Sequence, residues 1–269
     1  MRTECHQAAA LYRLVLPGHP LAGRLGERLG RGAGSSLEFM DFRNYVPGDD
    51  LRHVDWQAYA RTGQLTVRLF REETAPSLDV VADTTRSMAV TEAKARALVD
   101  LLDAAAEWSA RAGGVPRRLA AGGDVLPEGS EIPFDAADPD DLAPRAPLRP
   151  RVMRMLVSDF LRPEDPAPLI RRLAAGASHL YVLQLLDPWE LEPVADGERT
   201  LIEAEDGSRM DLVLDAESVR GYQGRLARLR ASVERAVRGV GGTYALVPAV
   251  EPAAMFRDHL LPQGVLEPA

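Results

Sequence analysis

Three short apolar runs, separated by stretches with other periodicities, constrain this fold most strongly. They are LDVVA at 78–82, VMRMLVS at 152–158 and HLYVLQLL at 179–186. Each run is continuous rather than alternating, which is typical of strands buried on both faces. A helical stripe lies between the first two runs, within residues 91–112, and consists of Ala97, Leu98, Leu101, Leu102, Ala105 and Trp108. Because strands and helices alternate, we expect an α/β domain with a largely parallel sheet and right-handed crossovers.

The remaining segments extend this pattern toward the C-terminus. We expect helices over 164–175, 216–238 and 252–261, a strand over 243–247, and a hairpin over 199–215 that turns at Asp206-Gly207. Residues 63–73 alternate apolar and polar side chains, as a half-buried strand does. The first part of the chain does not follow the strand–helix rhythm, and its Gly-rich segment 26–36 is best interpreted as a connector. We therefore predict an N-terminal portion, 1–76, and an α/β domain, 77–269.

Composition narrows the possible functions. The 269 residues include 40 acidic and 32 basic side chains, a formal charge of −8, which argues against a nucleic-acid binder held by phosphate contacts. Cys5 is the single cysteine, so neither an intrachain disulfide nor a zinc knuckle is available. No apolar run approaches the ~20 residues that cross a bilayer, and the N-terminus lacks the pattern of a secretory signal. We expect a cytoplasmic protein without a transmembrane segment.

Acids and hydroxyls follow the apolar runs at the points where ligands bind in such sheets. Asp83-x-Thr85-x-Ser87 follows the first run, Asp159 the second and Asp187 the third. Oxygen ligands of this kind suit Mg²⁺, which keeps several waters. The alternative is structural: Thr85 or Ser87 caps a nearby helix and Asp83 completes the turn. Spacing alone leaves both interpretations open.

The most crowded stretch is DFRNYVPGDDLRHVDWQAYARTG at 41–63, called the signature segment below. One interpretation is structural, with Asp41, Arg43, Arg52, Asp55 and Arg61 in buried bidentate ion pairs that attach the N-terminal portion to the sheet. A second is a docking surface with Trp56 and arginines as anchors. A third is acid–base catalysis by Asp49, Asp50 and His53. The absence of an accompanying serine or cysteine nucleophile disfavours the third.

Two resemblances follow from these residues. The signature segment and its flanks resemble the signature of the bacterial family catalogued as domain of unknown function 58. The matching positions at 38–67 are Glu38, Phe39, Asp41, Arg43, Tyr45, Pro47, Gly48, Asp49, Asp50, Arg52, Asp55, Trp56, Ala60, Arg61, Thr62, Gly63, Leu65 and Val67. The group Asp83, Thr85, Ser87 and Asp159 resembles the metal-ion-dependent adhesion site of von Willebrand factor A domains.

These resemblances imply a fold and a role. The fold is a von Willebrand factor A-like (Rossmann-like), mostly parallel sheet flanked by helices, with a smaller N-terminal β-containing portion. The role is a non-enzymatic adaptor that binds client proteins through a degenerate Mg²⁺-dependent adhesion-type site at the carboxyl edge of the sheet. It acts with a MoxR-type AAA+ ATPase in assembling or remodelling those clients. The signature residues are then a brace or docking face, and Asp83, Thr85, Ser87 and Asp159 are the ligands of a Mg²⁺ ion.

The sequence departs from the adhesion-site pattern in one respect. That site needs a further threonine from an intervening loop, and no threonine occurs between Thr91 and Thr200. Ser130 is the available substitute, in a Pro/Asp-rich region that we interpret as a loop replacing a helix, and Asp187 is a second accessory candidate. Mg²⁺ binding is then weak or completed by a partner's carboxylate. The rival hypothesis is a Mg²⁺-dependent hydrolase that uses Asp49, Asp83 and Asp159.

Overall fold

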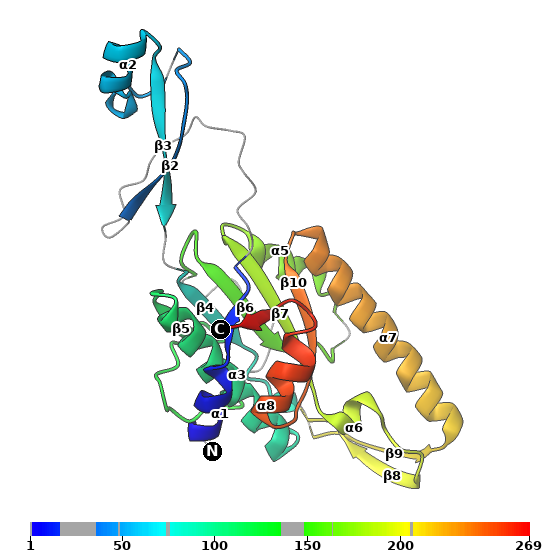
Figure 1. The fold of residues 1–269 in the computed structure, drawn as a ribbon. Coiled ribbons are helices and arrows are strands. Elements are labelled where there is room, and N and C mark those ends of the chain that lie inside the picture. The colour runs from blue at the N-terminus through cyan, green and yellow to red at the C-terminus, as the bar shows by residue number, and fades with distance from the viewer. Residues whose placement is uncertain are drawn as a thin grey trace. The chain divides into compact units, whose positions relative to one another are not determined.

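The computed structural model describes residues 2–16, 36–47, 49–73, 76–135, 148–162, 164–204 and 207–269, and over 36–41 and 68–73 it describes the backbone alone. The chain divides into two compact units (Figure 1). The larger unit combines residues 1–16 with 76–269, and the smaller unit lies within 17–75.

A five-stranded sheet forms the centre of the larger unit, in the order β10-β7-β6-β4-β5. Its strands are β4 (Leu78–Ala82), β5 (Pro116–Ala120), β6 (Met153–Ser158), β7 (His179–Leu186) and β10 (Thr243–Pro248). All four pairings are parallel, which confirms the α/β class. Strand β5 was not predicted, because its sequence PRRLA holds two arginines and occupies the edge of the sheet.

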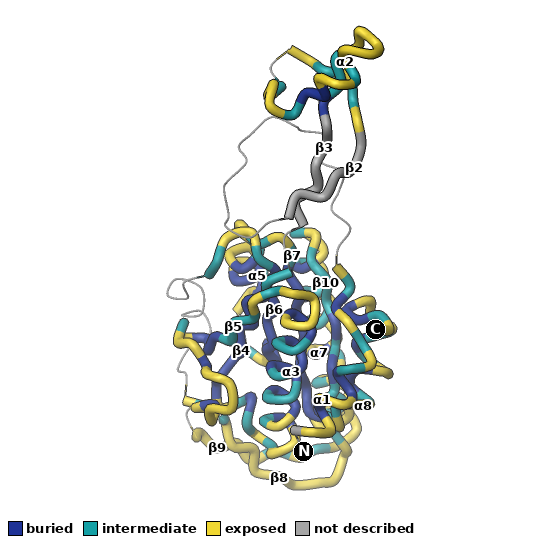
Figure 2. The backbone as a smooth tube through the Cα atoms, turned by 60° about the vertical axis from the view of Figure 1, so that its left-hand side comes forward, coloured by how far each residue is buried: buried dark blue, intermediate teal, exposed yellow. Residues whose placement is uncertain are grey.

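Helices cover both faces of this sheet. On one face, α1 (Arg2–Ala9), α3 (Glu92–Arg111) and α8 (Pro252–Ala254), which continues into a π-helical turn η4 (Met255–Leu260), share a core with alternate strand residues such as Val80 and Met155. On the other face, α5 (Ala167–Ala174) and α7 (Ala216–Gly239) pack with Val81 and Leu156. The alternation of strand residues between two cores explains the continuous apolar runs. Figure 2 shows the central strands as the buried interior of this unit.

The first residues of the chain lie in the larger unit, whereas the sequence grouped them with 1–76. Helix α1 packs on α3, where Cys5 and Ala9 are buried and the Trp108 indole donates a 3.0 Å hydrogen bond to the carbonyl of Ala9. Strand β1 (Tyr12–Leu14) pairs antiparallel with β11 (Leu266–Pro268). This contact joins the two ends of the chain, which local sequence patterns cannot reveal.

The smaller unit is an antiparallel hairpin with two helical turns between its strands. Strand β2 (Ser36–Asn44) pairs with β3 (Thr66–Glu73). Between them lie a 3₁₀ turn η1 (Leu51–His53) and the helix α2 (Trp56–Thr62). Asp55 caps α2, and Gly63 ends it with φ 71°, a conformation that favours glycine. The predicted strand over 63–73 therefore begins three residues later, after this cap.

Two further predictions concern loops of the larger unit. The hairpin forms from β8 (Gly197–Ile202) and β9 (Arg209–Leu214), while Asp206 of its predicted turn lies outside the described residues. The segment 121–135 contains no helix, as expected for a loop in place of a helix, and 136–147 lie outside the described residues. Most of the predicted connector 26–36 lies outside them too.

Candidate functional site

Asp83, Asp159 and Asp187 each follow the carboxyl end of a central strand. Strands β4, β6 and β7 are parallel neighbours, so these ends lie at one edge of the sheet. The Asp83 amide donates to the carbonyl of Val157 at 2.9 Å, which holds the loop after β4 against the end of β6. The topology therefore brings the predicted residues of both loops to the same edge.

Asp83 is embedded in hydrogen bonds from its own loop and from β6. The amide and hydroxyl of Thr85 donate to Asp83 Oδ1 at 3.0 and 2.7 Å, and the hydroxyl of Ser158 donates to Oδ2 at 2.7 Å. The hydroxyls of Thr85 and Ser87 lie 3.0 Å apart. Thr85 is also the N-cap residue of the 3₁₀ turn η2 (Arg86–Ala89), without a side-chain capping bond. Its hydroxyl instead donates to the Asp83 carboxylate and so stabilises the turn that begins at Asp83. The structural alternative predicted that Asp83 completes this turn.

The Asp83 carboxyl is in an environment that disfavours its charge. Burial raises its pKa above the usual value, and the nearby negative charge of Asp159 raises it further. Hydrogen bonds from Ser158 and Thr85 act in the opposite direction without cancelling this rise. Asp83 and Asp159 are therefore close enough to interact electrostatically.

Lys94, in the first turn of α3, supplies the positive charge that balances this edge, and the predictions from the sequence did not include it. Its Nζ donates to Asp159 Oδ2 at 2.9 Å and to Glu190 Oε1 at 2.8 Å, and its side chain has no exposed surface. Burial lowers the pKa of Lys94, but Asp159 and Glu190 raise it by more, so that it lies above the usual value. A signal was present in the sequence: Lys94 is its single lysine, and it stands one turn before Leu98 on the apolar stripe.

Glu190 belongs to a cap that follows β7. Asp187 is the N-cap residue of α6 (Pro188–Leu191), where its side chain accepts from the Trp189 amide at 2.9 Å and the Asp187 amide donates to Glu190 Oε2 at 2.7 Å. The hydroxyl of Thr91, the N-cap of α3, donates to Asp187 Oδ2 at 2.6 Å. Burial raises the pKa of the Glu190 carboxyl, against the lowering effect of Lys94. Asp187, predicted as an accessory ligand, thus joins two helix N-termini.

We call this group the carboxyl-edge cluster; it consists of Asp83, Thr85, Ser87, Lys94, Ser158, Asp159 and Glu190. The four residues predicted as ligands are part of it. However, their arrangement does not fit a hydrated Mg²⁺ ion. Asp83 and Asp159 are 2% and 3% exposed, although Mg²⁺ usually keeps several waters. Both oxygens of each carboxylate already accept a hydrogen bond, and an ammonium group holds Asp159. Among the described residues, no group of three or more His, Cys, Asp and Glu side chains is arranged to hold a metal ion.

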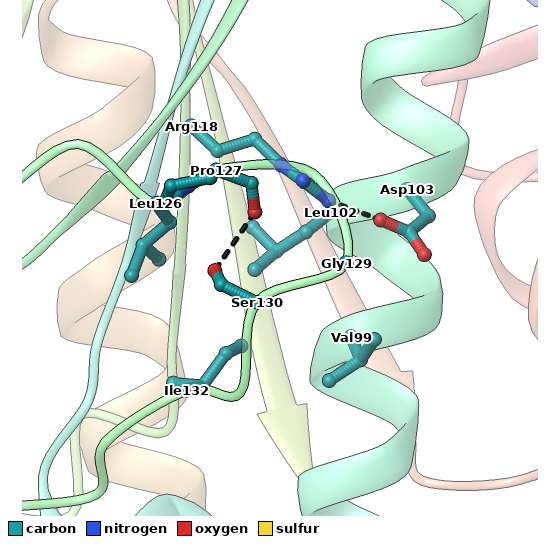
Figure 3. Close-up of a pocket in the computed structure, with 9 residues that line it drawn as sticks. All are labelled: Val99, Leu102, Asp103, Arg118, Leu126, Pro127, Gly129, Ser130 and Ile132. Carbon is teal, nitrogen blue, oxygen red and sulfur yellow. Dashed lines mark hydrogen bonds and ion pairs between the residues drawn. The ribbon is translucent and has the colours of Figure 1, made fainter.

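Ser130 lies elsewhere, in the wall of a small pocket between α3 and the loop after β5 (Figure 3). Its hydroxyl donates to the carbonyl of Pro127 at 2.8 Å, within its own turn. Its neighbours in the pocket wall include Val99 and Leu102 from the middle of α3. The predicted substitute for the missing threonine is therefore part of a local turn packed against α3.

Two of the arginines predicted to form ion pairs in the signature segment, Arg43 and Arg52, do so, but with Asp49 and Asp50 as partners. Arg43 forms a bidentate pair with Asp49, at 2.9 and 2.6 Å. Asp50 pairs with Arg52, whose side chain is 79% exposed. The hydrogen bond from Arg43 lowers the pKa of Asp49, and that from Arg52 lowers the pKa of Asp50 to about 2. The two pairs join residues six and two positions apart in sequence, so both are local to the turn. The second pair is exposed rather than buried.

The other predicted signature residues are distributed around this turn. Asp55 is buried and caps α2 by accepting from the amides of Gln57 and Ala58. Tyr45 is half-buried, and Pro47 and Arg61 are exposed. The side chain of Asp41 and all of Gly48 lie outside the described residues. The prediction of buried ion pairs is therefore wrong for Arg52 and Arg61, which are exposed. Asp55 is buried as predicted, and its carboxylate also caps a helix N-terminus.

The signature segment also exposes large apolar side chains. Trp56 is 56% exposed and contacts Tyr59 edge-on, with ring centroids 6.3 Å apart. Val46 and Leu51 are 56% and 54% exposed. By contrast, Val54 and Val67 are buried and form a bridge between the turn and β3. A small folded scaffold thus presents an apolar and aromatic surface.

Comparison with known proteins supports the resemblance drawn from the sequence. The family model described as "Protein of unknown function DUF58" matches residues 41–125. This range includes the signature segment, the Asp83 loop and Lys94. The match confirms the resemblance to domain of unknown function 58 proteins over these residues.

The relatives and solved structures found carry little functional information. Uncharacterized proteins of Mycobacterium bovis and Mycobacterium tuberculosis are 28% identical over 242 residues, which is 80% of this chain and 76% of theirs. A conserved hypothetical protein BatB from Bacteroides thetaiotaomicron is 14% identical with a TM-score of 0.33, over 68% of this chain and 94% of that one. An aerotolerance-related membrane protein from Bacteroides fragilis is 15% identical with a TM-score of 0.35, over 70% and 98%. In the part of this chain that the structure describes, no helix has the length and apolar character needed to span a membrane.

Proposed function

We propose that this chain is a non-enzymatic protein-binding module that acts as an adaptor for a MoxR-type AAA+ ATPase in the assembly or remodelling of client proteins. The family resemblance suggests the partner, and because that partner consumes ATP, the proposal places the chain in the cytoplasm. The proposed docking surface consists of the exposed apolar side chains of the signature segment, which are Val46, Leu51, Trp56 and Tyr59.

The observation that carries this proposal is the exposure of these side chains on a pre-organised turn. Trp56 and Leu51 are each more than half exposed, although tryptophan is among the residues that contribute most to protein interfaces. The bidentate Arg43–Asp49 pair and the Asp55 cap order the backbone that presents them. Ordering a surface before it binds lowers the entropic cost of association.

The hydrogen bonds that Asp49, Asp83 and Asp159 already accept within the protein support a non-catalytic role. A general acid or base must be within hydrogen-bond reach of a substrate. Asp49 accepts from Arg43 and the Val46 amide, Asp83 from Thr85 and Ser158, and Asp159 from Lys94 and the Leu161 amide. The rival hydrolase would have to break these contacts to use the same groups. Mg²⁺-dependent turnover that vanishes in Asp83→Asn would favour that rival.

The test compares two tryptophans of similar exposure. Trp56 is 56% exposed in the signature segment, and Trp189 is 51% exposed in α6. We expect the full chain to bind a purified MoxR-type ATPase encoded in the same genome in a biolayer assay. Trp56→Ala weakens binding by about tenfold or more, the effect of losing about 1.4 kcal/mol at an interface, whereas Trp189→Ala leaves binding within about twofold.

Two results would contradict the proposal. One is a folded wild-type chain that does not bind the ATPase, with or without nucleotide. The other is an equal loss of binding in both tryptophan variants, since that would place the contact outside the signature segment.

A further inference from the structure

Lys94 joins three parts of the larger unit at the carboxyl edge of the sheet. Lys94 lies in the first turn of α3. Its Nζ donates to Asp159 Oδ2, just after β6, at 2.9 Å, and to Glu190 Oε1, in α6, at 2.8 Å. These partners are 65 and 96 residues away in sequence. No surface of the Lys94 side chain is exposed.

A fully buried ammonium group is stable only when it is paired with negative charges. Lys94 has two carboxylate partners, and a third carboxyl, Asp83, interacts with Asp159. The same acidic groups would be the charged ligands of a divalent cation at this edge. A metal ion beside Asp159 would lie close to the positive charge of Lys94, and in a site shielded from water that repulsion is strong.

We propose that the Lys94 ammonium is the resident cation of the carboxyl-edge cluster, in place of a divalent metal ion. The cluster is then complete without metal, and the folded chain does not recruit Mg²⁺ or Mn²⁺ there. This inference is independent of the docking surface on the signature segment, because it concerns different residues.

The proposal implies that removing the side chain of Lys94 creates a metal site. A Lys94→Ala variant would leave the oxygens of Asp159 and Glu190 without their cation, next to Asp83 and the hydroxyls of Thr85 and Ser87. Oxygen donors of this kind suit Mg²⁺ and Mn²⁺. The truncated side chain also leaves room for the ion. In Lys94→Met the charge is absent but the space is filled.

The first experiment uses the wild-type chain, in which Lys94 is the single lysine. Selective isotope labelling of lysine gives one side-chain NMR signal that reports on the cluster directly. Titration with Mn²⁺, a paramagnetic ion, broadens the signal of any group a few ångströms away. We expect this signal to keep its width, and calorimetry to show no saturable binding of Mg²⁺ or Mn²⁺.

The second experiment compares variants of α3. We expect Lys94→Ala to bind one Mn²⁺ saturably and to show a melting temperature that rises with Mn²⁺ concentration, as ligand linkage requires. Lys94→Met and Arg96→Ala serve as controls. Arg96 is an exposed cation on the same helix, paired with Glu92, so its loss changes the net charge equally without opening the cluster.

The outcomes separate the proposal from its rivals. Saturable Mn²⁺ binding by the wild-type chain that broadens the lysine signal and disappears in Asp83→Asn would overturn it. So would a folded Lys94→Ala that binds no metal. If Lys94→Ala folds only when Mn²⁺ is present, the proposal is supported. If it folds under neither condition, the wild-type titration alone decides: broadening refutes the proposal, and an unchanged signal supports it.

Discussion

The carboxyl-edge cluster and the signature segment are both rich in charged and hydroxyl residues, but they differ in what surrounds those residues. In the cluster, Asp83, Lys94 and Asp159 are at most 3% exposed and bond across β4, α3 and β6. In the signature segment, the ion pairs are local and Trp56 is 56% exposed. Density of charge therefore does not identify a site. The flanking apolar residues decide whether a polar group is part of a buried network or of an exposed surface.

The largest expected effect is on the buried side of this comparison. Lys94→Met leaves Asp159 and Glu190 buried without their cation, and breaking such a pair costs about 3–5 kcal/mol. Arg96→Ala, an exposed change on the same helix, should alter the free energy of unfolding by less than about 0.5 kcal/mol. Urea denaturation followed by far-ultraviolet circular dichroism measures both. Equal, small losses would show that the cluster contributes no more than a surface pair.

The two regions should also respond to pH in opposite directions. The folded pKa of Asp83 is raised above the usual 3.8, so its contribution to stability is present below that value and is lost as pH rises through the folded pKa. Asp50 has a folded pKa of about 2, so its contribution is present above 3.8 and is lost as pH falls toward about 2. Carboxyl-carbon NMR of labelled aspartates measures both values, with Asp83→Asn and Asp50→Asn for assignment. A folded Asp83 that titrates below 3.8 would contradict the burial of its charge.

An intermediate, local effect is expected for Arg43. Arg43→Ala removes the bidentate partner of Asp49, which also accepts from the Val46 amide at 2.8 Å. We expect faster amide exchange at Val46 and its neighbours, without a change in the unfolding of the larger unit. Arg52→Ala is the matched control, because its pair with Asp50 is exposed and exposed pairs contribute little. If Arg52→Ala has the larger effect on exchange, the Arg43–Asp49 pair does not order the turn.

The two regions also differ in how much of their structure could be predicted from the sequence. The strands β4, β6 and β7 were predicted because they are continuous apolar runs buried on both faces, and the helix α3 because its buried residues repeat with the helical period. Asp83, Thr85 and Asp159 were placed at one edge because parallel strands end together. Their balancing charge was missed, since Lys94 meets Asp159 and Glu190 only through the tertiary fold. The Arg43–Asp49 pair was missed for a different, local reason: several charges lie close together in the sequence of the signature segment, and the residue pattern does not show which of them the turn brings together.

The smallest expected effect on stability is that of Trp56→Ala, and it gives the sharpest contrast between the two regions. Trp56 contacts Tyr59 but is 56% exposed, whereas Trp108 is 2% exposed and donates to the Ala9 carbonyl. Surface substitutions usually change stability by less than about 0.5 kcal/mol, while truncating a buried tryptophan costs about 3–5 kcal/mol. Thermal unfolding of Trp56→Ala and Trp108→Ala compares them directly. If Trp56→Ala melts much earlier than the wild-type chain, Trp56 supports the fold of the signature segment, and a loss of partner binding in that variant would no longer identify a docking surface. If its melting is unchanged while partner binding falls, the exposed aromatic side chain acts at the interface itself.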